Sequence, residues 1–355
     1  MSESITTLPV FDHERVVTGV GARSGLTMTV ALHSSALGPA LGGCRTWTYD
    51  TWLDALADAL RLASAMTMKN AAAGLDAGGG KSVIRLAPGE TLEGERRTAA
   101  FLDLGDLVES LDGRYRTAED VGTTADDMQV VAQRTRHVVG LPSATGGSGE
   151  PAGPTSAGVL AALRTVLRAL HGDPSFAGRS FVVSGLGQVG SRVATRLAEE
   201  GGILTVSDVD ARKRELVTSL GATWVEPDEA LLVPADVFVP AGVGGVLTPE
   251  AIERLDVRAV VGPANNPLAE RAGAARLAER GVLYAPDFVV NAGGVIYLTL
   301  AAEGAATDVI DTRIRAIGDT LGRVLAQAEA TGTTPLVAAE ALAFARLDAR
   351  KERNA

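Results

Sequence analysis

The chain of 355 residues contains a single cysteine, Cys44, so it cannot form an intramolecular disulfide. This excludes a disulfide-stapled fold of the secreted type and a cysteine-rich metal cluster. The four histidines are scattered without the spacing of metal ligands, and we therefore expect no metal site. Cys44 is expected to be a small packing residue, with a reactive thiol as the alternative.

Basic residues and long apolar runs are also scarce. The chain has 33 Lys and Arg against 43 Asp and Glu, a net charge of −10. Nucleic acids and anionic membranes both require a basic surface, so neither is an expected partner. No apolar stretch approaches the ~20 residues of a membrane span, and the first residues lack the basic-then-apolar pattern of a signal peptide. We expect a cytoplasmic protein with small-molecule partners.

Aromatic residues make up only 4% of the chain, whereas hydrophobic residues as a whole make up 46%. Ala, Leu and Val must therefore fill most of the core, and the length is sufficient for two domains. Residues 142–154 hold three prolines and four glycines and almost nothing apolar, which is typical of a boundary. The sequence predicts one domain at 1–148, a second at 149–334, and a C-terminal helix at 335–355 that packs back on the first.

The first predicted domain is mixed α and β. Residues 26–32 alternate like a strand, and 54–66 carry apolar residues at helical spacing. The three glycines at 78–80 are expected to break the chain before a strand at 81–86. Thr124, followed by Asp126 and Asp127, predicts a capped helix that runs to about residue 135.

The second predicted domain alternates strands and helices after a helix at 155–170. Strands are expected at 180–184, 203–207, 237–239, 259–261 and 282–284, with helices at 188–200, 212–220 and 268–280 among them. This rhythm predicts a parallel sheet covered on both faces. Two longer helices, at 308–329 and 335–350, close the chain.

A dinucleotide-binding pattern stands at the first strand of this second domain. Gly185, Gly187 and Gly190 form Gly-x-Gly-x-x-Gly between a strand and a helix, where free N–H groups favour a pyrophosphate. Asp208 ends the next strand, 23 residues beyond Gly185, where a carboxylate binds ribose hydroxyls and favours NAD over NADP. Arg212 and the lysine after it could bind a 2′-phosphate, so NADP stays an alternative cofactor. The alternative is a glycine turn with Asp208 as a surface cap.

Two lysines frame the glycine run of the first domain, Lys69 at a helix end and Lys81 directly after the third glycine. Burial and a neighbouring ammonium both disfavour the charged form of a lysine, which can then act as a general base. Asp120 is a candidate carboxylate partner. The alternative is that both lysines are solvated and that Asp120 is a turn residue.

Motifs around these residues resemble those of one enzyme family. Met-Lys-Asn-Ala-Ala-Ala-Gly-Leu at 68–75 and Gly-Gly-Gly-Lys-Ser at 78–82 resemble the signature of the glutamate/leucine/phenylalanine/valine dehydrogenases. Matching motifs also occur at 37–45, 117–122, 284–287 and 291–295, so the resemblance extends from about residue 30 to about residue 300. It is strongest to the leucine-specific members.

The resemblance implies an α/β fold of two domains, with a mixed α/β substrate domain, a Rossmann-type doubly wound NAD-binding domain and a cleft between them. A hinge is expected at 142–154. It also implies that Lys81 is the catalytic base, that Asp120 binds the reacting groups, and that Lys69 binds the substrate carboxylate. Further substrate contacts are expected from Gly43, Asn266, Leu41, Ala118, Val295 and Leu298. Cofactor contacts are expected from Gly185, Leu186, Gly187, Gln188, Val189, Gly190, Asp208, Arg45, Thr155, Ala241 and Asn265. The division of roles between Asn265 and Asn266 stays open, because Pro263 and Pro267 depart from the family pattern.

The implied activity is the reversible, NAD-dependent oxidative deamination of a hydrophobic L-amino acid to a 2-oxo acid and ammonia. Branched-chain substrates are favoured, and phenylalanine or another aromatic amino acid such as tryptophan is the alternative. A non-enzymatic NAD-binding sensor would have no reason to keep Lys69, Lys81 and Asp120 together. A homo-oligomer is expected, of unspecified size.

Overall fold

The computed structural model describes residues 12–142 and 149–354. The chain divides into two compact units: Met1–Glu150 with Leu298–Gly304 and Ala343–Ala355, and Pro151–Tyr297 with Ala305–Leu342. Helices α10 (Gly293–Ala302) and α13 (Pro335–Asn354) thus contribute residues to both units. Part of the predicted hinge, 143–148, lies outside the described residues, and the hinge stays a prediction.

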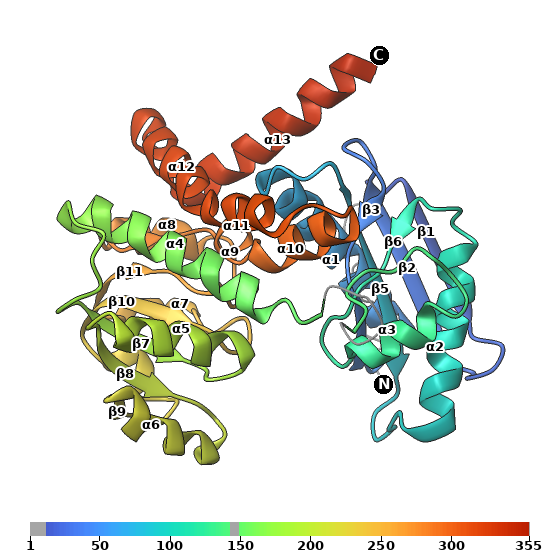
Figure 1. Cartoon of the computed structure of the whole chain (residues 1–355), viewed down its shortest axis with the longest axis horizontal. Coiled ribbons are helices and arrows are strands. Elements are labelled where there is room, and N and C mark those ends of the chain that lie inside the picture. The colour runs from blue at the N-terminus through green and yellow to red at the C-terminus, as the bar shows by residue number, and fades with distance from the viewer. Residues whose placement is uncertain (1–11, 143–148, 355) are drawn as a thin grey trace, which may run out of the picture. The chain divides into compact units, whose positions relative to one another are not determined.

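The first unit contains a mixed sheet in the order β1-β2-β5-β3-β6, with β4 also paired to β5 (Figure 1). Strands β1 and β5 are antiparallel to β2, whereas β3 and β4 are parallel to β5. The strands are β1 (Arg15–Val20), β2 (Thr27–Ser34), β3 (Ala40–Leu41), β4 (Cys44–Thr48), β5 (Gly78–Leu86) and β6 (Tyr115–Arg116). The helices are α1 (Trp52–Ala72), α2 (Gly94–Glu109) and α3 (Ala125–Val131). The predicted strand at 26–32 corresponds to β2, and the predicted helix at 54–66 is the middle of α1.

Helix α1 begins at a capping box, in which the Thr51 hydroxyl accepts from the Asp54 N–H and the Asp54 carboxylate accepts from the Thr51 N–H. Its buried face carries small residues, including Ala55, Ala59 and Ala63, which pack against β2 and β5. Small side chains let the helix backbone approach the sheet closely. Because these side chains are small, α1 packs closely against β5, the strand that carries Lys81.

The three glycines at 78–80 do not break the chain, and that prediction was wrong. They are the first residues of β5. A Cβ added at Gly79 would lie 2.1 Å from the Thr67 backbone nitrogen in α1, and one at Gly80 would lie 2.8 Å from the ring of Tyr115. Glycine in a strand often marks a place where another backbone approaches closely. Here it allows α1 and the buried tyrosine to contact the strand.

The second unit is built on a six-stranded sheet in the order β12-β11-β10-β7-β8-β9, in which every pairing is parallel (Figure 1). The order reverses between β7 and β10, which is the doubly wound Rossmann arrangement with its ligand-binding switch point. This confirms the predicted fold class. The strands are β7 (Ser180–Ser184), β8 (Ile203–Ser207), β9 (Thr223–Trp224), β10 (Ala235–Pro240), β11 (Val257–Val260) and β12 (Leu283–Tyr284). The helices include α4 (Ala152–His171), α5 (Gln188–Glu199), α6 (Glu215–Leu220), α7 (Pro249–Arg254), α8 (Gly273–Glu279) and α9 (Asp287–Val290).

Two helices of this unit differ from their predictions. The predicted helix at 268–280 is only α8, because Leu268 forms a parallel bridge with Leu247 and residues 269–272 form bends and turns before the helix begins. The predicted helix at 308–329 is two helices, α11 (Thr307–Arg315) and α12 (Ile317–Thr331). They meet beside α4, where the Thr165 hydroxyl donates to the Gly318 carbonyl oxygen at 3.1 Å.

Candidate active site

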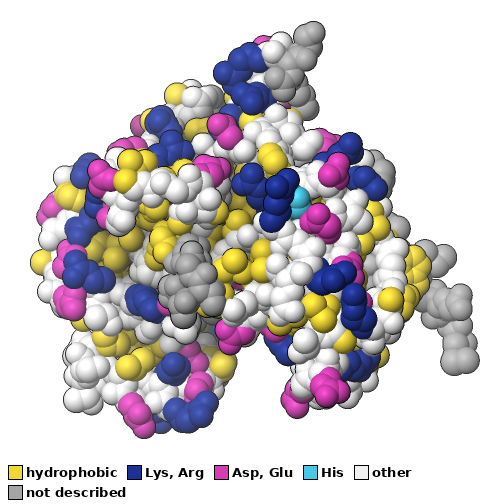
Figure 2. Space-filling view, turned by 45° about the vertical axis from the view of Figure 1, so that its right-hand side comes forward, with side chains coloured by type: hydrophobic (Ala, Val, Ile, Leu, Met, Phe, Trp, Pro, Cys, Tyr) yellow, Lys and Arg dark blue, Asp and Glu magenta, His cyan; other side chains and the backbone are white. Residues whose placement is uncertain are grey.

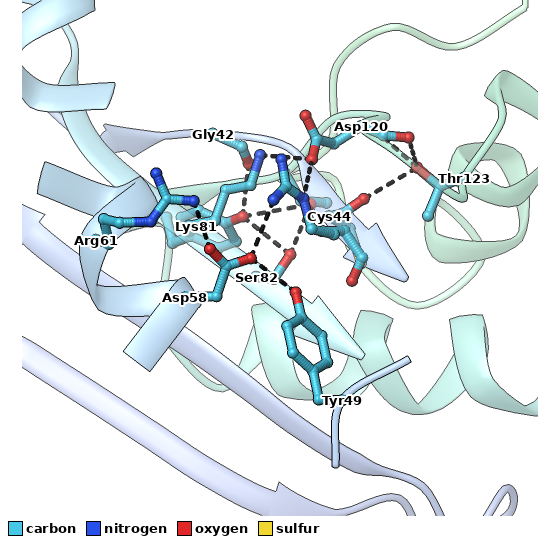
Figure 3. A network of polar contacts seen from close by, with 12 residues as sticks. Gly42, Cys44, Tyr49, Asp58, Arg61, Lys81, Ser82, Asp120 and Thr123 are labelled. Atoms are coloured by element: carbon cyan, nitrogen blue, oxygen red, sulfur yellow. Dashed lines mark hydrogen bonds and ion pairs between the residues drawn. The ribbon is translucent and has the colours of Figure 1, made fainter. Parts of the chain in front are cut away.

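Lys81 and Asp120, the two predicted catalytic residues, are in direct contact. Lys81 lies in β5 with only 4% of its surface exposed, and its Nζ is 2.9 Å from Asp120 Oδ2 (Figure 3). Asp120 belongs to the loop after β6, which is fixed because the Thr123 hydroxyl accepts from the Asp120 N–H at 2.8 Å. Burying a charged amine costs free energy unless the amine is paired with an opposite charge. The solvated-lysine alternative therefore does not describe Lys81.

The Asp120 carboxylate has a second cationic partner, Arg45 in β4, whose Nε donates to the same Oδ2 atom at 3.0 Å. Burial raises the pKa of Asp120, but Lys81 and Arg45 outweigh this effect and hold the pKa at about 2. Asp120 is therefore a hydrogen-bond acceptor at any pH at which an enzyme would work. Its Oδ1 atom contacts no hydrogen-bond donor among the described residues.

The polar network continues beyond Arg45. The Arg45 Nη1 donates to Asp58 Oδ2 in α1 at 3.0 Å, and the Tyr49 hydroxyl donates to the same oxygen at 2.7 Å (Figure 3). Arg61 Nη2 donates to Asp58 Oδ1 at 2.6 Å. Neither Asp58 nor Tyr49 was predicted from the sequence as a site residue. The i, i+3 spacing of Asp58 and Arg61 was the only local signal, and it indicates merely an ion pair on a helix.

Cys44 precedes Arg45 in β4 and is fully buried. Burial raises the pKa of its thiol to about 12. A thiol with such a pKa is hardly ionised near neutral pH and is a poor nucleophile. The expectation of a packing residue is confirmed.

The other predicted substrate residues of the first unit lie on neighbouring elements. Lys69 is half-buried in the last turn of α1. A Cβ at Gly43 would lie 2.4 Å from the Glu119 carbonyl oxygen, so the chain passes close to the loop that carries Asp120. Leu41, Ala118 and Leu298 are buried and apolar, and a Cβ added at Gly140 would contact the side chain of Leu298.

The glycine-rich turn in the second unit has the geometry that a dinucleotide requires. Gly185 has φ 109°, and a Cβ at Gly190 would lie 2.0 Å from the Gly185 carbonyl oxygen. Nothing stands within 4 Å of a Cβ added at Gly187, the N-cap of α5, and no side chain caps that helix. Gln188 and Val189 lie in its first turn, whose N–H groups can bind an anion. These residues fit a pyrophosphate.

Asp208 follows β8 directly beside this turn. Its Oδ2 accepts from the Leu186 N–H at 2.6 Å, and its Oδ1 accepts from the Asp210 N–H at 2.8 Å. The carboxylate is thus held at the carboxyl end of the sheet and keeps lone pairs for ribose hydroxyls. Arg212 is exposed, and its guanidinium forms two hydrogen bonds to Asp210, both at 2.9 Å.

The remaining predicted residues lie around the carboxyl ends of the strands and in the helices that follow. Ala241 follows β10, and its Cβ would be 2.9 Å from a Cβ at Gly190. Thr155 is in the first turn of α4, and its hydroxyl donates to the Pro151 carbonyl oxygen at 2.9 Å. The structure also describes Asn265, Asn266 and the half-buried Val295.

The two asparagines have different surroundings. The Asn265 Oδ1 accepts from the Asn291 side-chain amide at 2.9 Å. Asn266 has φ 49°, in the left-handed region, and its N–H donates to Asp287 Oδ2 at 2.8 Å. A backbone held in that region is uncommon outside glycine and often occurs at functional sites. Which asparagine meets the substrate stays a prediction.

Other surface features of the described residues point to no competing site. Two hollows of about 440 and 480 Å³ adjoin α4 and α12, and none of the predicted site residues lines them. No helix in the described part is long and apolar enough to cross a membrane, and no cluster of side chains there could hold a metal ion. On the face shown in Figure 2, Lys and Arg side chains are interspersed with Asp and Glu.

The doubly wound sheet with its glycine turn, together with the buried lysine–carboxylate pair, defines a class of protein: the two-domain oxidoreductases that use a nicotinamide dinucleotide. Comparison with known proteins specifies the class. The model for the Glu/Leu/Phe/Val dehydrogenase dimerisation domain matches residues 15–137, and the model for the glutamate/leucine/phenylalanine/valine dehydrogenases matches 146–212 and 210–354.

Individual relatives agree with these models over nearly the whole chain. The chain is 39% identical to the leucine dehydrogenase of Thermoactinomyces intermedius over 97% of its own length and 93% of the relative. It is also 39% identical to the phenylalanine dehydrogenase of Bacillus thermotolerans, with 97% and 90% covered. The crystal structure of L-tryptophan dehydrogenase from Nostoc punctiforme superimposes with a TM-score of 0.82 at 34% identity, covering 96% of this chain and 97% of that one.

The chain belongs to the glutamate/leucine/phenylalanine/valine dehydrogenase family. It is an amino-acid dehydrogenase, an enzyme that acts on a CH–NH₂ group with a nicotinamide cofactor. The resemblance inferred from the sequence motifs is confirmed, and the alternative of a non-enzymatic sensor is wrong.

Proposed function

We propose that the enzyme catalyses the reversible, NAD-dependent oxidative deamination of a hydrophobic L-amino acid, with branched-chain substrates preferred. The observation that supports this most directly is the buried Lys81 amine at 2.9 Å from Asp120. Once Lys81 has released the proton that it donates to Asp120, its amine can take a proton from water, and its carboxylate partner can bind the substrate amine. This is the chemistry that deamination needs after hydride removal.

Each residue of this site has a distinct part in the reaction. Lys69 binds the substrate carboxylate, and Asp120 accepts a hydrogen bond from the substrate amine. A nicotinamide dinucleotide held at the turn of Gly185, Gly187 and Gly190 would supply a hydride acceptor, and removal of a hydride from the Cα of the neutral substrate amine would leave an iminium ion. Lys81 then removes a proton from the water that adds to the iminium carbon. Loss of ammonia from the resulting adduct gives the 2-oxo acid.

The proposed preference for branched-chain substrates rests on the apolar side chains of Leu41, Ala118 and Val295, which match those of leucine dehydrogenases, whereas Leu298 departs from that pattern and leaves an aromatic substrate open. None of them is a cation, which a glutamate side chain would require. Leucine and phenylalanine dehydrogenases are equally similar to the chain, and a tryptophan dehydrogenase has the same fold. An aromatic substrate is therefore the second candidate.

NADH formation by the purified protein with a panel of L-amino acids tests the proposal. We expect kcat/KM to be highest for Leu, Ile or Val and negligible for glutamate. Extra or missing methylenes in an apolar pocket are worth ~1–3 kcal/mol each, so the preference over Phe should be graded. A maximum with Phe or Trp would replace the proposed substrate, and turnover of glutamate alone would reject the apolar pocket.

We expect replacement of Asp208 by alanine to lower the ratio of kcat/KM with NAD to that with NADP by about tenfold or more. The carboxylate repels a 2′-phosphate, and Arg212, which could bind one, is engaged by Asp210. Arg212→Ala is the matched control and should leave the preference of the wild type for NAD unchanged. A wild-type preference for NADP would show that the carboxylate does not select the cofactor.

We also propose that the enzyme is a cytoplasmic homo-oligomer. The family model that matches residues 15–137 is described as a dimerisation domain, which supports self-association. The single, buried cysteine is compatible with a reducing compartment.

A further inference from the structure

The network around the active site contains a half-buried acid, Asp58, that no step of the proposed reaction uses. Asp58 lies in α1 with 15% of its side chain exposed. Its Oδ2 accepts hydrogen bonds from Arg45 and Tyr49, and its Oδ1 accepts one from Arg61. Burial raises the pKa of Asp58, but the hydrogen bonds from Tyr49 and Arg61 and the charge of Arg45 hold the pKa below its ordinary value. Asp58 is therefore ionised at neutral pH.

Arg45 is held between two carboxylates on different elements. Its Nε donates to Asp120 and its Nη1 donates to Asp58, both at 3.0 Å. Lys81, Asp120, Arg45 and Asp58 thus form a chain of alternating charge (Figure 3). Two fixed contacts determine the plane of the guanidinium. The contact of Nη1 with Asp58 restrains this plane so that Nη2, the group beside Nε, makes no hydrogen bond to Asp120.

The restraint by Asp58 prevents the contact that an isolated arginine and carboxylate would favour. An arginine and a carboxylate prefer a fork, in which two N–H groups bind the two carboxylate oxygens. Arg45 instead reaches Asp120 with Nε alone and shares Oδ2 with Lys81. The Oδ1 atom of Asp120 is left without a donor among the described residues. It is this oxygen that can accept a hydrogen bond from the substrate amine.

We propose that Asp58 is a positioning residue for the catalytic pair, which restrains Arg45 and so keeps one oxygen of Asp120 available to the substrate. The inference rests on the proposed function, because it assigns that oxygen to the substrate amine. Without Asp58, Arg45 turns toward Asp120 and forms the fork. The substrate amine is then held out of the position that hydride removal requires, and Lys81 loses part of its contact with Oδ2.

The kinetic test is Asp58→Ala, with Asp58→Asn as the conservative variant. We expect kcat to fall by ~10–100-fold in Asp58→Ala, as for other small displacements of reacting groups, with a smaller loss in Asp58→Asn. KM for the amino acid should change by less than about threefold, because Lys69 is untouched. Arg61→Gln is the matched control: it removes the exposed partner of Asp58 but leaves Arg45 anchored, and kcat should stay within about twofold.

A double-mutant cycle separates positioning from a general loss of structure. If Asp58 acts through Arg45, adding Asp58→Ala to Arg45→Met should lower kcat by no more than about twofold. Independent, multiplicative losses would overturn the proposal. So would an Asp58→Ala enzyme with wild-type kcat.

A crystal structure of Asp58→Ala provides a readout that does not depend on turnover. We expect Arg45 to contact both oxygens of Asp120. An unchanged single contact through Nε would overturn the inference even if the variant were slow. Failure of the wild type to oxidise any amino acid would instead reject the proposed function, and the crystal structure would still decide the role of Asp58.

Discussion

Replacing Lys81 with alanine is expected to reduce kcat for deamination by about 10²–10⁴-fold, the usual effect of removing a general base. The amine is the only buried base in contact with Asp120 among the described residues. NADH affinity should stay within about twofold of the wild type, because β5 belongs to the first unit and the glycine turn to the second. Fluorescence titration with NADH and steady-state kinetics measure the two effects separately.

The variant should fold, because Asp120 keeps Arg45 as a partner when Lys81 is removed. Lys69→Ala is the matched control. The charge of Lys69 holds the substrate carboxylate in the ground and transition states alike, so its removal should appear mainly as a higher KM. Added small amines should restore part of the activity of Lys81→Ala. A Lys81→Ala enzyme with near-normal kcat would reject the mechanism.

The first strands of the cofactor-binding unit were predicted accurately because their signals are local, although two of its helices differ from their predictions. The strands at 180–184 and 203–207 have the predicted bounds, since each is a short run rich in apolar residues that is next to glycine or a polar turn. The turn at Gly185 and the carboxylate of Asp208 lie where the fingerprint places them. The parallel sheet was predicted from the alternation of strands and helices rather than from any single residue, whereas its strand order was not predicted.

The first unit was predicted less completely, because its short strands are defined by partners far away in sequence. Strands β3 and β6 have two residues each and exist through pairing with β5 and with each other. No local pattern marks such strands. Helix α10 was also missed: it is almost entirely apolar, and a helix without a polar face has no amphipathic periodicity.

In the candidate site too, some features were predicted from the sequence and others depend on packing between distant elements. The contact between Lys81 and Asp120 followed from motifs that the family shares, 39 positions apart in the sequence. The anchoring role of Asp58 could not be predicted, because it depends on the distance between α1 and β4, which only the packed structure determines. Arg45 was predicted as a cofactor contact, and the structure adds two acidic partners to it.

The close packing of α1 on β5 leads to a second large expected effect. Gly79→Ala should destabilise the first unit by about 3 kcal/mol, in the upper range for overpacked sites. The added methyl would meet the backbone nitrogen and the hydroxyl of Thr67, each at 2.1 Å. Neither the strand nor the helix can give way without moving Lys81, two residues along β5, or Lys69, two residues along α1. Activity should therefore fall at least tenfold even where the variant remains folded.

Gly19→Ala is the matched control, because Gly19 also lies in a strand of the first unit and nothing stands within 4 Å of its added Cβ. Its stability should stay within about 0.5 kcal/mol of the wild type, as for other unobstructed surface positions. Urea unfolding followed by tryptophan fluorescence reports on the first unit through Trp47 and Trp52, and Trp224 adds a signal from the second unit that the Gly19→Ala control shares. NADH binding by Gly79→Ala should persist, since the glycine turn lies in the second unit. Equal stability and equal kcat in the two variants would show that α1 does not depend on glycine at position 79 to pack against β5.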